Sequence, residues 1–558
     1  MVATNETTPF LGGTGTGKSP QRKSIRSMSK GAVVKATGEG RPALTGYGDD
    51  DDMAGWGDDD ISQFDAIMHL IKGNLGPGVL NLPHAFATAG WVLGFLLAAL
   101  VAFQGIYSMV LLVYCKEYVR ADLKKKRLRQ QQEKRRRENE GRAPEVHEVY
   151  ADENSICTFM DIAYATNGEA VSIVVQILLF ICQGGVCCVF LNLIATNLHA
   201  LLPSSYDSET CIYLTTGLLL LVVLVRDLKE LKWLSMGANV MMVTAIFTAS
   251  GSAMYVLYQN YQKNNNSDDA DFEVEDHEES HYKKFTTKPA VIATFVSSIY
   301  YSFEGIGLVM PIENSFVGYK DMHTARVGST DNDAENGAND NNIHEDDEDE
   351  VVRKASRSKL FISPVLIGSM CLVAFLFLLI GVTCGPAFPD NVDGSVTAYL
   401  STKYPDSLWY QCVNASVMVA VFLTFPLQLT PAMEVLQEWF GPGCNPCNSF
   451  NSDAGSCNAS VVKQKGVQKY EWIFRRYLVV LSCSLIVLTV NDLGLLIALF
   501  GAVGNTGLAA MPCVFHLKLM QDKRAPYHGV LWSIDVGIIA LGVAVAIAGV
   551  TSALQEIF

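Results

Sequence analysis

The first residues that could bind a ligand lie in an apolar stretch, Ile67–Ala87, which contains the run Gly73–Gly78 with the sequence GNLGPG. In a helix interior each glycine costs about 1 kcal/mol relative to alanine, and proline costs about 3 kcal/mol. The stretch is long and apolar enough to enter a bilayer, where an unpaired backbone group costs several kcal/mol. The sequence therefore predicts a helix broken at membrane depth, whose bare N–H and C=O groups face a polar cavity and can bind a ligand.

A second weak point for a helix lies near residues 289–315, where Ser297–Gly307 holds two glycines and the carboxylate of Glu304. A charged carboxylate at the bilayer centre costs about 2.5–3.5 kcal/mol on insertion scales, so Glu304 must be protonated, paired or in contact with water. Gly305 and Gly307 have another interpretation, because small residues also let helices pack closely. Two interrupted segments at corresponding positions are typical of inverted repeats with a ligand site between them, which favours the functional interpretation.

His69 lies one helical turn before the first break and, with Glu304, is a candidate proton-binding group. Unperturbed histidine changes its charge near pH 6.5, so modest changes in its surroundings move it across the physiological range. The alternatives are a neutral histidine packed against a neighbour and, for Glu304, a structural hydrogen bond. Lys72 is either a charged neighbour of His69 or a partner of Glu304 or Glu313, and the sequence does not choose between them.

Only helices that cross a membrane can position these residues. The chain is 49% hydrophobic and 18% charged, whereas soluble proteins average about 25% charged residues. Its apolar residues cluster in runs near the roughly 20 residues that span a bilayer, so we predict an all-α polytopic membrane protein with eleven spans. They lie near residues 66–88 (broken), 91–115, 170–200, 211–226, 233–258, 289–315 (interrupted), 360–382, 412–436, 476–491, 494–517 and 529–552.

Lysine and arginine are concentrated in loops on one side of an eleven-span topology, and the positive-inside rule makes that side the cytosol. The N-terminal tail, residues 1–60, is expected to be disordered and is then cytosolic. The transmembrane domain comprises residues 61–558, and its first residues are cytosolic as well. The loops expected in the cytosol are a basic loop at 116–160, an acidic loop at 318–358 and a cysteine-containing loop at 438–475. The acidic loop 259–288 falls outside or in a lumen, where Asn265 is a candidate for glycosylation.

Three motifs, KGNLGPGVLNLPHAFATAGW, RDLKELKWLSMGANV and YSFEGIGLVMPIEN, resemble the amino acid/auxin permease family, most closely its branch of proton-coupled amino acid transporters. The similarity covers residues 63–317 and continues more weakly through FLTFPLQLTPAMEVL and GLLIALFGAVGNTGLAAMPCVF. The resemblance implies a LeuT-type fold, a five-plus-five inverted repeat of eleven helices with helices 1 and 6 interrupted. It also implies amino-acid substrates and proton coupling, with His69 at the place of the branch's candidate histidine.

An amino acid needs hydrogen-bond donors for its carboxylate and acceptors for its ammonium group. The N-terminal end of a half-helix supplies donors and a positive dipole end, and unwound carbonyls supply acceptors. We therefore expect the carboxylate on the backbone of Asn74, Leu75, Gly76 and Gly78. The ammonium group is expected near the carbonyls of Tyr301, Ser302 and Phe303, and the two aromatic rings would border the side-chain pocket unless they serve ordinary packing.

The prediction is a secondary active amino acid transporter, a proton/amino acid symporter that works toward the cytosol by alternating access, in the vacuolar or lysosomal membrane or in the plasma membrane. Two alternatives stay open: coupling to sodium, which carbonyls of the same cavity could hold, and an amino-acid sensor with little transport. The expected partners are the bilayer, the amino acid and the co-transported proton or sodium ion, with no cofactor and no nucleic acid. The chain is not predicted to be an enzyme, because it shows no nucleophile–base set, metal triad or cofactor fingerprint.

Most of the 14 cysteines lie in apolar runs and are expected to be small buried hydrophobes. Cys211 and Cys384 fall at the edges of outer loops, and the family resemblance implies a disulfide between them, with Cys412 as a rival partner. The cysteines of residues 444–457 hint at zinc but lack a fourth ligand at suitable spacing, so reduced thiols and no metal site are expected there.

Overall fold

The computed structural model describes residues 62–140, 156–203, 205–224, 231–265, 285–303, 305–316, 361–391, 394–440, 465–490 and 492–557. The predicted tail, most of the two acidic loops and the cysteines of residues 444–457 lie outside these ranges, as does Glu304. Asn265 is the last residue of a helix.

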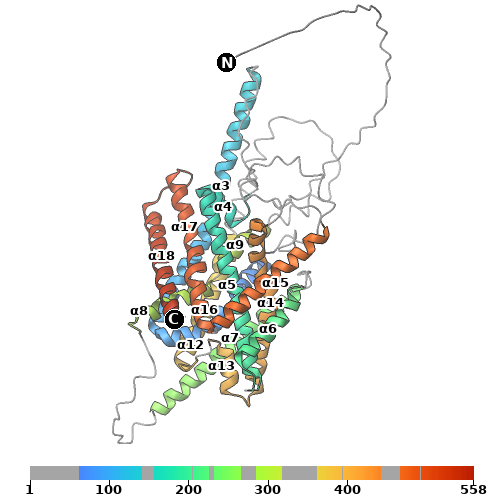
Figure 1. The fold of residues 1–558 in the computed structure, drawn as a ribbon. Coiled ribbons are helices and arrows are strands. Elements are labelled where there is room, and N and C mark those ends of the chain that lie inside the picture. The colour runs from blue at the N-terminus through green and yellow to red at the C-terminus, as the bar shows by residue number, and fades with distance from the viewer. Residues whose placement is uncertain are drawn as a thin grey trace, which may run out of the picture. The chain divides into compact units, whose positions relative to one another are not determined.

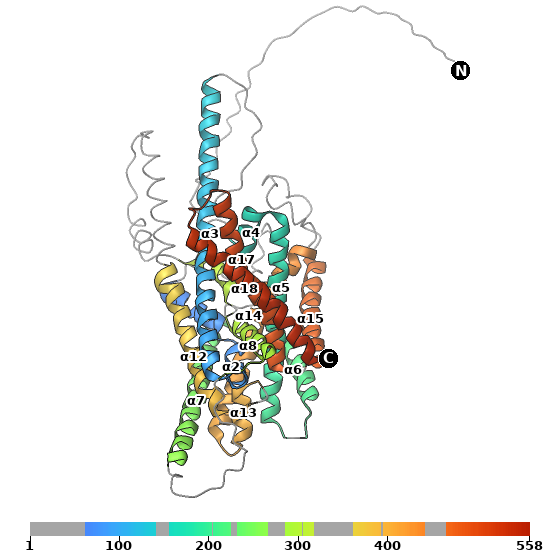
Figure 2. The same ribbon diagram turned by 90° about the vertical axis from the view of Figure 1, so that its left-hand side faces the viewer.

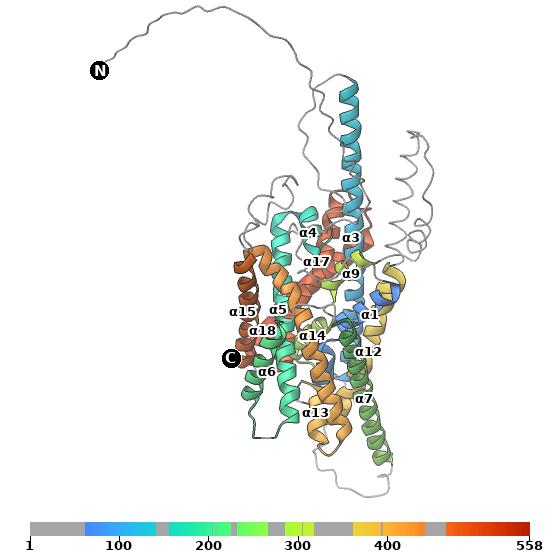
Figure 3. The same ribbon diagram turned by 90° about the vertical axis from the view of Figure 1, so that its right-hand side faces the viewer.

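The regular elements of the described ranges are helices (Figure 1, Figure 2 and Figure 3). They are α1 (Gln63–Asn74), α2 (Pro77–Ala89), α3 (Trp91–Asn139), α4 (Phe159–Asn167), α5 (Glu169–Leu201), α6 (Ser208–Val222), α7 (Leu231–Asn265), α8 (Pro289–Ser302), α9 (Ile306–Ser315), η2 (Phe361–Ile367), α12 (Gly368–Ala387), α13 (Val396–Lys403), α14 (Leu408–Phe440), α15 (Lys465–Thr489), α16 (Leu493–Phe500), η4 (Gly501–Asn505), α17 (Thr506–Gln521) and α18 (Gly529–Ile557).

Eight helical segments in the described part of the chain are long and apolar enough to cross a membrane, which confirms a polytopic helical membrane protein. The remaining predicted spans coincide with the pair α1 and α2, with the 15-residue α6 and with α15. The eleven-span count and the five-plus-five repeat stay predictions.

Helix α3 corrects the predicted loop at 116–160, because the helix runs for 49 residues and ends only at Asn139. At about 1.5 Å per residue it is about 70 Å long, and its charged end extends past the neighbouring helices (Figure 1 and Figure 2). Lysine, arginine, glutamine and glutamate are good helix formers, and ion pairs one turn apart add support. The pairs are Lys126–Asp122, Arg137–Glu133 and Arg136–Glu140.

Helix α5 packs closely along the segment α16–η4–α17 because glycines remove side chains from the interface. A Cβ atom on Gly185 of α5 would lie 2.3 Å from the ring of Phe500, and one on Gly504 would lie 2.9 Å from Cα of Cys182. Small residues at such positions let helix backbones approach in a membrane, where packing drives association. This contact fixes η4 against α5, and η4 in turn touches α8.

The predicted disulfide between Cys211 and Cys384 is wrong in this structure: both cysteines are free and buried, and Cys412 is free as well. The reason is packing, since α6, which carries Cys211, contacts α5, α14 and α15, whereas α12, which carries Cys384, contacts α2, α3 and α7. The thiol of Cys384 lies 3.7 Å from the hydroxyl of Thr383 instead.

Because both thiols are free, the chain denatured without reductant should be alkylated by iodoacetamide at Cys211 and at Cys384. Peptide mass spectrometry would check this directly. A pair of peptides that stays linked until dithiothreitol is added would contradict the structure.

Candidate functional site

The first predicted break is present. Helix α1 ends at Asn74, Leu75 has non-helical backbone angles (φ −84°, ψ 65°), and α2 begins at Pro77 after Gly76 in an extended conformation. The N–H of Leu75 donates to the carbonyl of Ile71 at 2.9 Å, so this predicted donor is already used. The first N–H groups of a helix have no intrahelical partner, which leaves Gly76 and Gly78 as the donors at the start of α2.

The second predicted interruption is also present, between Ser302 at the end of α8 and Ile306 at the start of α9. Phe303 leaves the helical conformation (φ −94°, ψ 45°), although its N–H still donates to the carbonyl of Ile299. Gly305 precedes α9. Glu304 lies outside the described residues, so its role stays a prediction.

The two breaks touch each other through Asn74 and Gly78. The side-chain amide of Asn74 donates to the carbonyl of Leu70 at 2.8 Å and accepts from the N–H of Gly305 at 3.2 Å. A Cβ atom on Gly78 would lie 2.7 Å from Oγ and 2.9 Å from Cα of Ser302. Asn74 was predicted to act through its backbone; its observed role is a side-chain bridge between the breaks.

This arrangement brings four helix ends together. The C-terminal ends of α1 and α8 carry partial negative charge, and the N-terminal ends of α2 and α9 carry partial positive charge, each roughly half an elementary charge. Positive and negative ends at one place match a ligand that has both an anionic and a cationic group, provided that water is kept out. The described residues around the breaks are buried: Asn74, Ser302 and Tyr301 are 2%, 3% and 1% exposed.

The aromatic residues at the second break are packed rather than open to a cavity in this conformation. Phe303 is 7% exposed, and its ring meets the ring of Phe377 edge-on, with 4.9 Å between centroids. Tyr301 is also buried, and its carbonyl accepts a hydrogen bond. A ligand can reach these side chains only if the surrounding helices move.

Asn505 is a site residue that the sequence did not reveal. Its amide donates to the carbonyls of Tyr300 and Tyr301 at 3.2 and 3.1 Å, and its oxygen accepts from the thiol of Cys182 at 2.6 Å. It ends the π-helical segment η4, and π-helical turns often occur at functional sites. Asn505 therefore holds the last carbonyls of α8 in place beside the break; the signal in the sequence was only the glycine-rich run Gly501–Gly507.

Replacing Asn505 with leucine should lower both stability and activity, because two buried carbonyls lose a donor and each such loss costs about 1–3 kcal/mol. The matched control is Asn414, a buried asparagine whose amide also donates to a backbone carbonyl, that of Asn197, at 3.0 Å. Asn414→Leu should also lower the melting temperature, but the activity per folded molecule should fall in Asn505→Leu and not in Asn414→Leu. Equal activity of the two variants per folded molecule would contradict the role of Asn505.

Two titratable residues discussed above, His69 and Glu313, lie away from the contact between the breaks. His69 is half-buried in α1, on the half of the broken helix that precedes Gly73. Glu313 of α9, one of the partners considered for Lys72, pairs with Lys116 of α3. No group of three or more His, Cys, Asp or Glu side chains gathers as metal ligands would within the described ranges.

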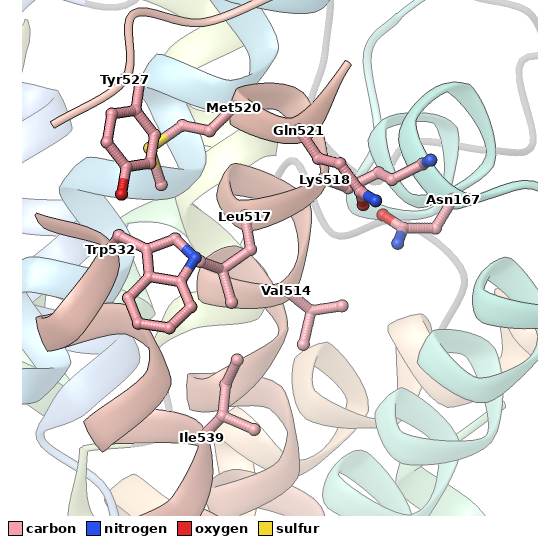
Figure 4. Close-up of a pocket in the computed structure, with 9 residues that line it drawn as sticks. All are labelled: Asn167, Val514, Leu517, Lys518, Met520, Gln521, Tyr527, Trp532 and Ile539. Atoms are coloured by element: carbon pink, nitrogen blue, oxygen red, sulfur yellow. The ribbon is translucent and has the colours of Figure 1, made fainter. Parts of the chain in front are cut away.

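Two cavities adjoin the helices of the site. One, of about 520 Å³, lies between α17 and α18 and is lined by Lys518, Tyr527 and Trp532 among others (Figure 4). The other, of about 360 Å³, lies between α2 and α8 and is named here the α2–α8 cavity. Its lining includes Ser298, one turn before Ser302, so this cavity leads toward the breaks.

Comparison with known proteins gives a matching family model and several similar proteins. The family model described as transmembrane amino acid transporter protein matches residues 59–132, 145–328 and 352–555. Amino acid transporter AVT3C of Arabidopsis thaliana is 22% identical, over 91% of this chain and 94% of that protein. The proton-coupled amino acid transporter-like protein pathetic of Drosophila melanogaster is 23% identical, over 88% of this chain and 84% of that protein. Vacuolar amino acid transporter 3 of Saccharomyces cerevisiae is 22% identical, over 86% of this chain but 54% of that protein.

Proposed function

The chain belongs to the transmembrane amino acid transporter family, and from that premise we propose that it is a secondary active transporter that carries amino acids together with protons toward the cytosol by alternating access. The observation that carries the proposal is the meeting of four helix ends at Asn74, Gly78, Ser302 and Gly305. An α-carboxylate fits the positive ends of α2 and α9, and an α-ammonium group fits the negative ends of α1 and α8.

The proposed binding groups follow from the observed contacts. The N–H groups of Gly76 and Gly78 bind the carboxylate, and the carbonyls around Ser302 and Phe303 bind the ammonium group. Tyr301 and Phe303 border the substrate side chain once the bundle opens. The carboxylate and ammonium groups bound at the breaks are common to all amino acids, and the rings of Tyr301 and Phe303 provide mainly apolar contacts. The breaks therefore recognise amino acids as a class, and neighbouring side chains select among them.

Proton coupling supplies enough energy for accumulation. One proton moving down a potential of about 100 mV gains about 2.3 kcal/mol, and one pH unit adds about 1.4 kcal/mol. Since about 1.4 kcal/mol corresponds to a tenfold ratio, the two together support a gradient of several hundredfold. His69 and Glu304 are the proposed coupling groups, and a similar protein named proton-coupled supports the choice of ion.

The membrane of residence is proposed to be a vacuolar or lysosomal one, with the plasma membrane as the alternative. A similar yeast protein is named as vacuolar. The side rich in lysine and arginine, which includes the charged end of α3, is proposed to face the cytosol. A luminal space that is more acidic than the cytosol would then drive the amino acid outward into the cytosol.

Uptake into proteoliposomes tests this function. The purified protein is reconstituted, and the uptake of radiolabelled amino acids is measured with an imposed pH gradient, with an imposed sodium gradient, and with neither. Uptake that requires the pH gradient and stops when a protonophore is added supports the proposal. Uptake that requires sodium and ignores the pH gradient replaces the proton with sodium, and amino acid binding without uptake under any gradient supports a sensor.

A further inference from the structure

The α2–α8 cavity contains a histidine that the proposed binding groups do not include. Four residues of α2 line the cavity at helical spacing, Asn81, His84, Ala85 and Thr88, so one face of this helix borders it. On α8 the lining changes from exposed Ala290 through half-buried Thr294 to buried Ser298. The cavity therefore extends from the surface inward along α8, toward Ser302 and the breaks.

The hydrogen bond of His84 fixes which ring nitrogen can take a proton. Its Nδ1 lies 2.6 Å from the backbone carbonyl of Asn391. A carbonyl can only accept, so Nδ1 carries the hydrogen and donates it. In the neutral ring the lone pair is then on Nε2, which is the nitrogen that accepts an incoming proton.

Two acceptor oxygens and the His84 ring lie around one point next to Gly494. A Cβ atom on Gly494 would lie 3.3 Å from Oδ1 of Asp492, 3.4 Å from Oδ1 of Asn81 and 3.5 Å from Cδ2 of His84. Asn81 is 1% exposed, and its Oδ1 has no hydrogen-bond partner. A carboxylate and a buried amide oxygen in need of a donor are groups that stabilise a nearby cation.

We propose that His84, together with Asp492 and Asn81, takes up the coupling proton at the non-cytosolic mouth of the transport path. The inference rests on the proposed proton symport. In the proposed orientation His69 lies on the cytosolic half of the broken helix, so a proton that arrives from the other side meets the α2–α8 cavity first. Nε2 of neutral His84 accepts a proton from a hydronium ion, which leaves water and an imidazolium. The Asp492 carboxylate is the counter-ion for that charge.

Asp492 is the proposed counter-ion of protonated His84, because the other charged groups on the surrounding elements do not line the cavity. Of the charged groups in the described part of these elements, Asp492 alone shares the cavity lining with His84. Helix α3 has no Asp, Glu, Lys or Arg before Lys116. Other charged or titratable groups on elements packed against α2 include Lys288 before α8, Glu169 and His199 in α5, Cys384 in α12, Asp390 after α12 and Lys403 in α13, and none of these lines the cavity.

The test compares His84→Gln with the wild type and with His199→Gln, a matched change at an exposed histidine in the last turn of α5. Glutamine can still donate to the Asn391 carbonyl but cannot hold a proton. With a gradient of one pH unit and no potential, one-proton coupling supports accumulation of about tenfold. His84→Gln should lose this accumulation and keep amino acid counterflow, which needs no net proton movement, whereas His199→Gln should behave as the wild type.

A second variant separates a proton site from a merely structural histidine. Asp492 accepts a hydrogen bond from the N–H of Leu495, 2.8 Å away, at the start of α16. Because asparagine caps helices equally well, the Asp492→Asn variant should fold. Removal of a carboxylate disfavours a nearby imidazolium, so the outer pH that gives half-maximal uptake should fall, by about one unit.

The outcomes distinguish this inference from the function on which it rests. Wild-type uptake that ignores a pH gradient overturns the symport, and the role of His84 with it. Wild-type uptake driven by pH, combined with unchanged coupling in His84→Gln or an unchanged pH profile in Asp492→Asn, overturns the role of His84 alone.

Discussion

Alanine in place of Gly78 is expected to reduce the initial rate of amino acid uptake by between about fivefold and about a hundredfold, because overpacking of this kind costs about 1–3 kcal/mol. The added Cβ would lie 2.9 Å from Cα of Ser302, and a backbone atom cannot rotate away as a side chain can. Helix α2 would be pushed from α8 at the point where the two breaks meet. Radiolabelled uptake into proteoliposomes with an imposed pH gradient measures the effect.

Gly184→Ala is the matched control, because no atom lies within 4 Å of the Cβ it would add in the middle of α5. It should leave uptake unchanged. Adding Ser302→Gly to Gly78→Ala should recover part of the rate, since this removes Cβ and Oγ but not Cα from the contact. A Gly78→Ala variant that retains most of the wild-type rate would show that the observed contact between the breaks is not needed for transport.

Methionine in place of Lys116 is expected to lower the free energy of unfolding by about 3–5 kcal/mol, the usual cost of removing one partner from a buried ion pair. The side chains of Lys116 and Glu313 are 0% and 4% exposed, and Lys116 also donates to Asn314. The pair ties α3 to α9, the second half of the interrupted helix. The loss would be seen as a lower melting temperature of the protein in detergent and as unfolding at a lower mole fraction of dodecyl sulfate.

The double variant Lys116→Met, Glu313→Gln should recover part of this stability, because no charge is then buried without a partner. Lys518→Met serves as the matched control: Lys518 pairs with Asp522 one turn away on the exposed surface of α17. Such surface pairs contribute about 0.3–0.5 kcal/mol. If Lys116→Met and Lys518→Met had the same stability, the buried pair would not hold α9 in place.

Local backbone chemistry was enough to predict both helix interruptions. The run Gly73–Gly78 combines three glycines with Pro77, and the region after Ser302 combines two glycines with a carboxylate, so neither needed knowledge of its neighbours. The polytopic helical class followed in the same way from the length of the apolar runs. These features depend on residues that are close in the sequence.

The contacts that complete the site could not be predicted, because they join residues far apart in the sequence. Asn74 and Gly305 are 231 positions apart, and Asn505 and Tyr300 are 205 positions apart. The pairing of Lys116 with Glu313 is of the same kind. The length of α3 was missed for another reason: hydropathy indicates where a helix leaves the lipid, not where it ends. The disulfide rested on resemblance alone, and packing overturned it.

We propose that the transported amino acid binds between the two helix breaks. Photocrosslinking tests it most directly: a diazirine amino acid that competes for uptake is bound to the reconstituted protein and irradiated, and the labelled peptides are mapped by mass spectrometry. We expect labels near Leu75–Gly78 and Ser298–Phe303 that disappear with excess unlabelled substrate. Competable labels confined to the cavity between α17 and α18, with neither break labelled, would contradict it.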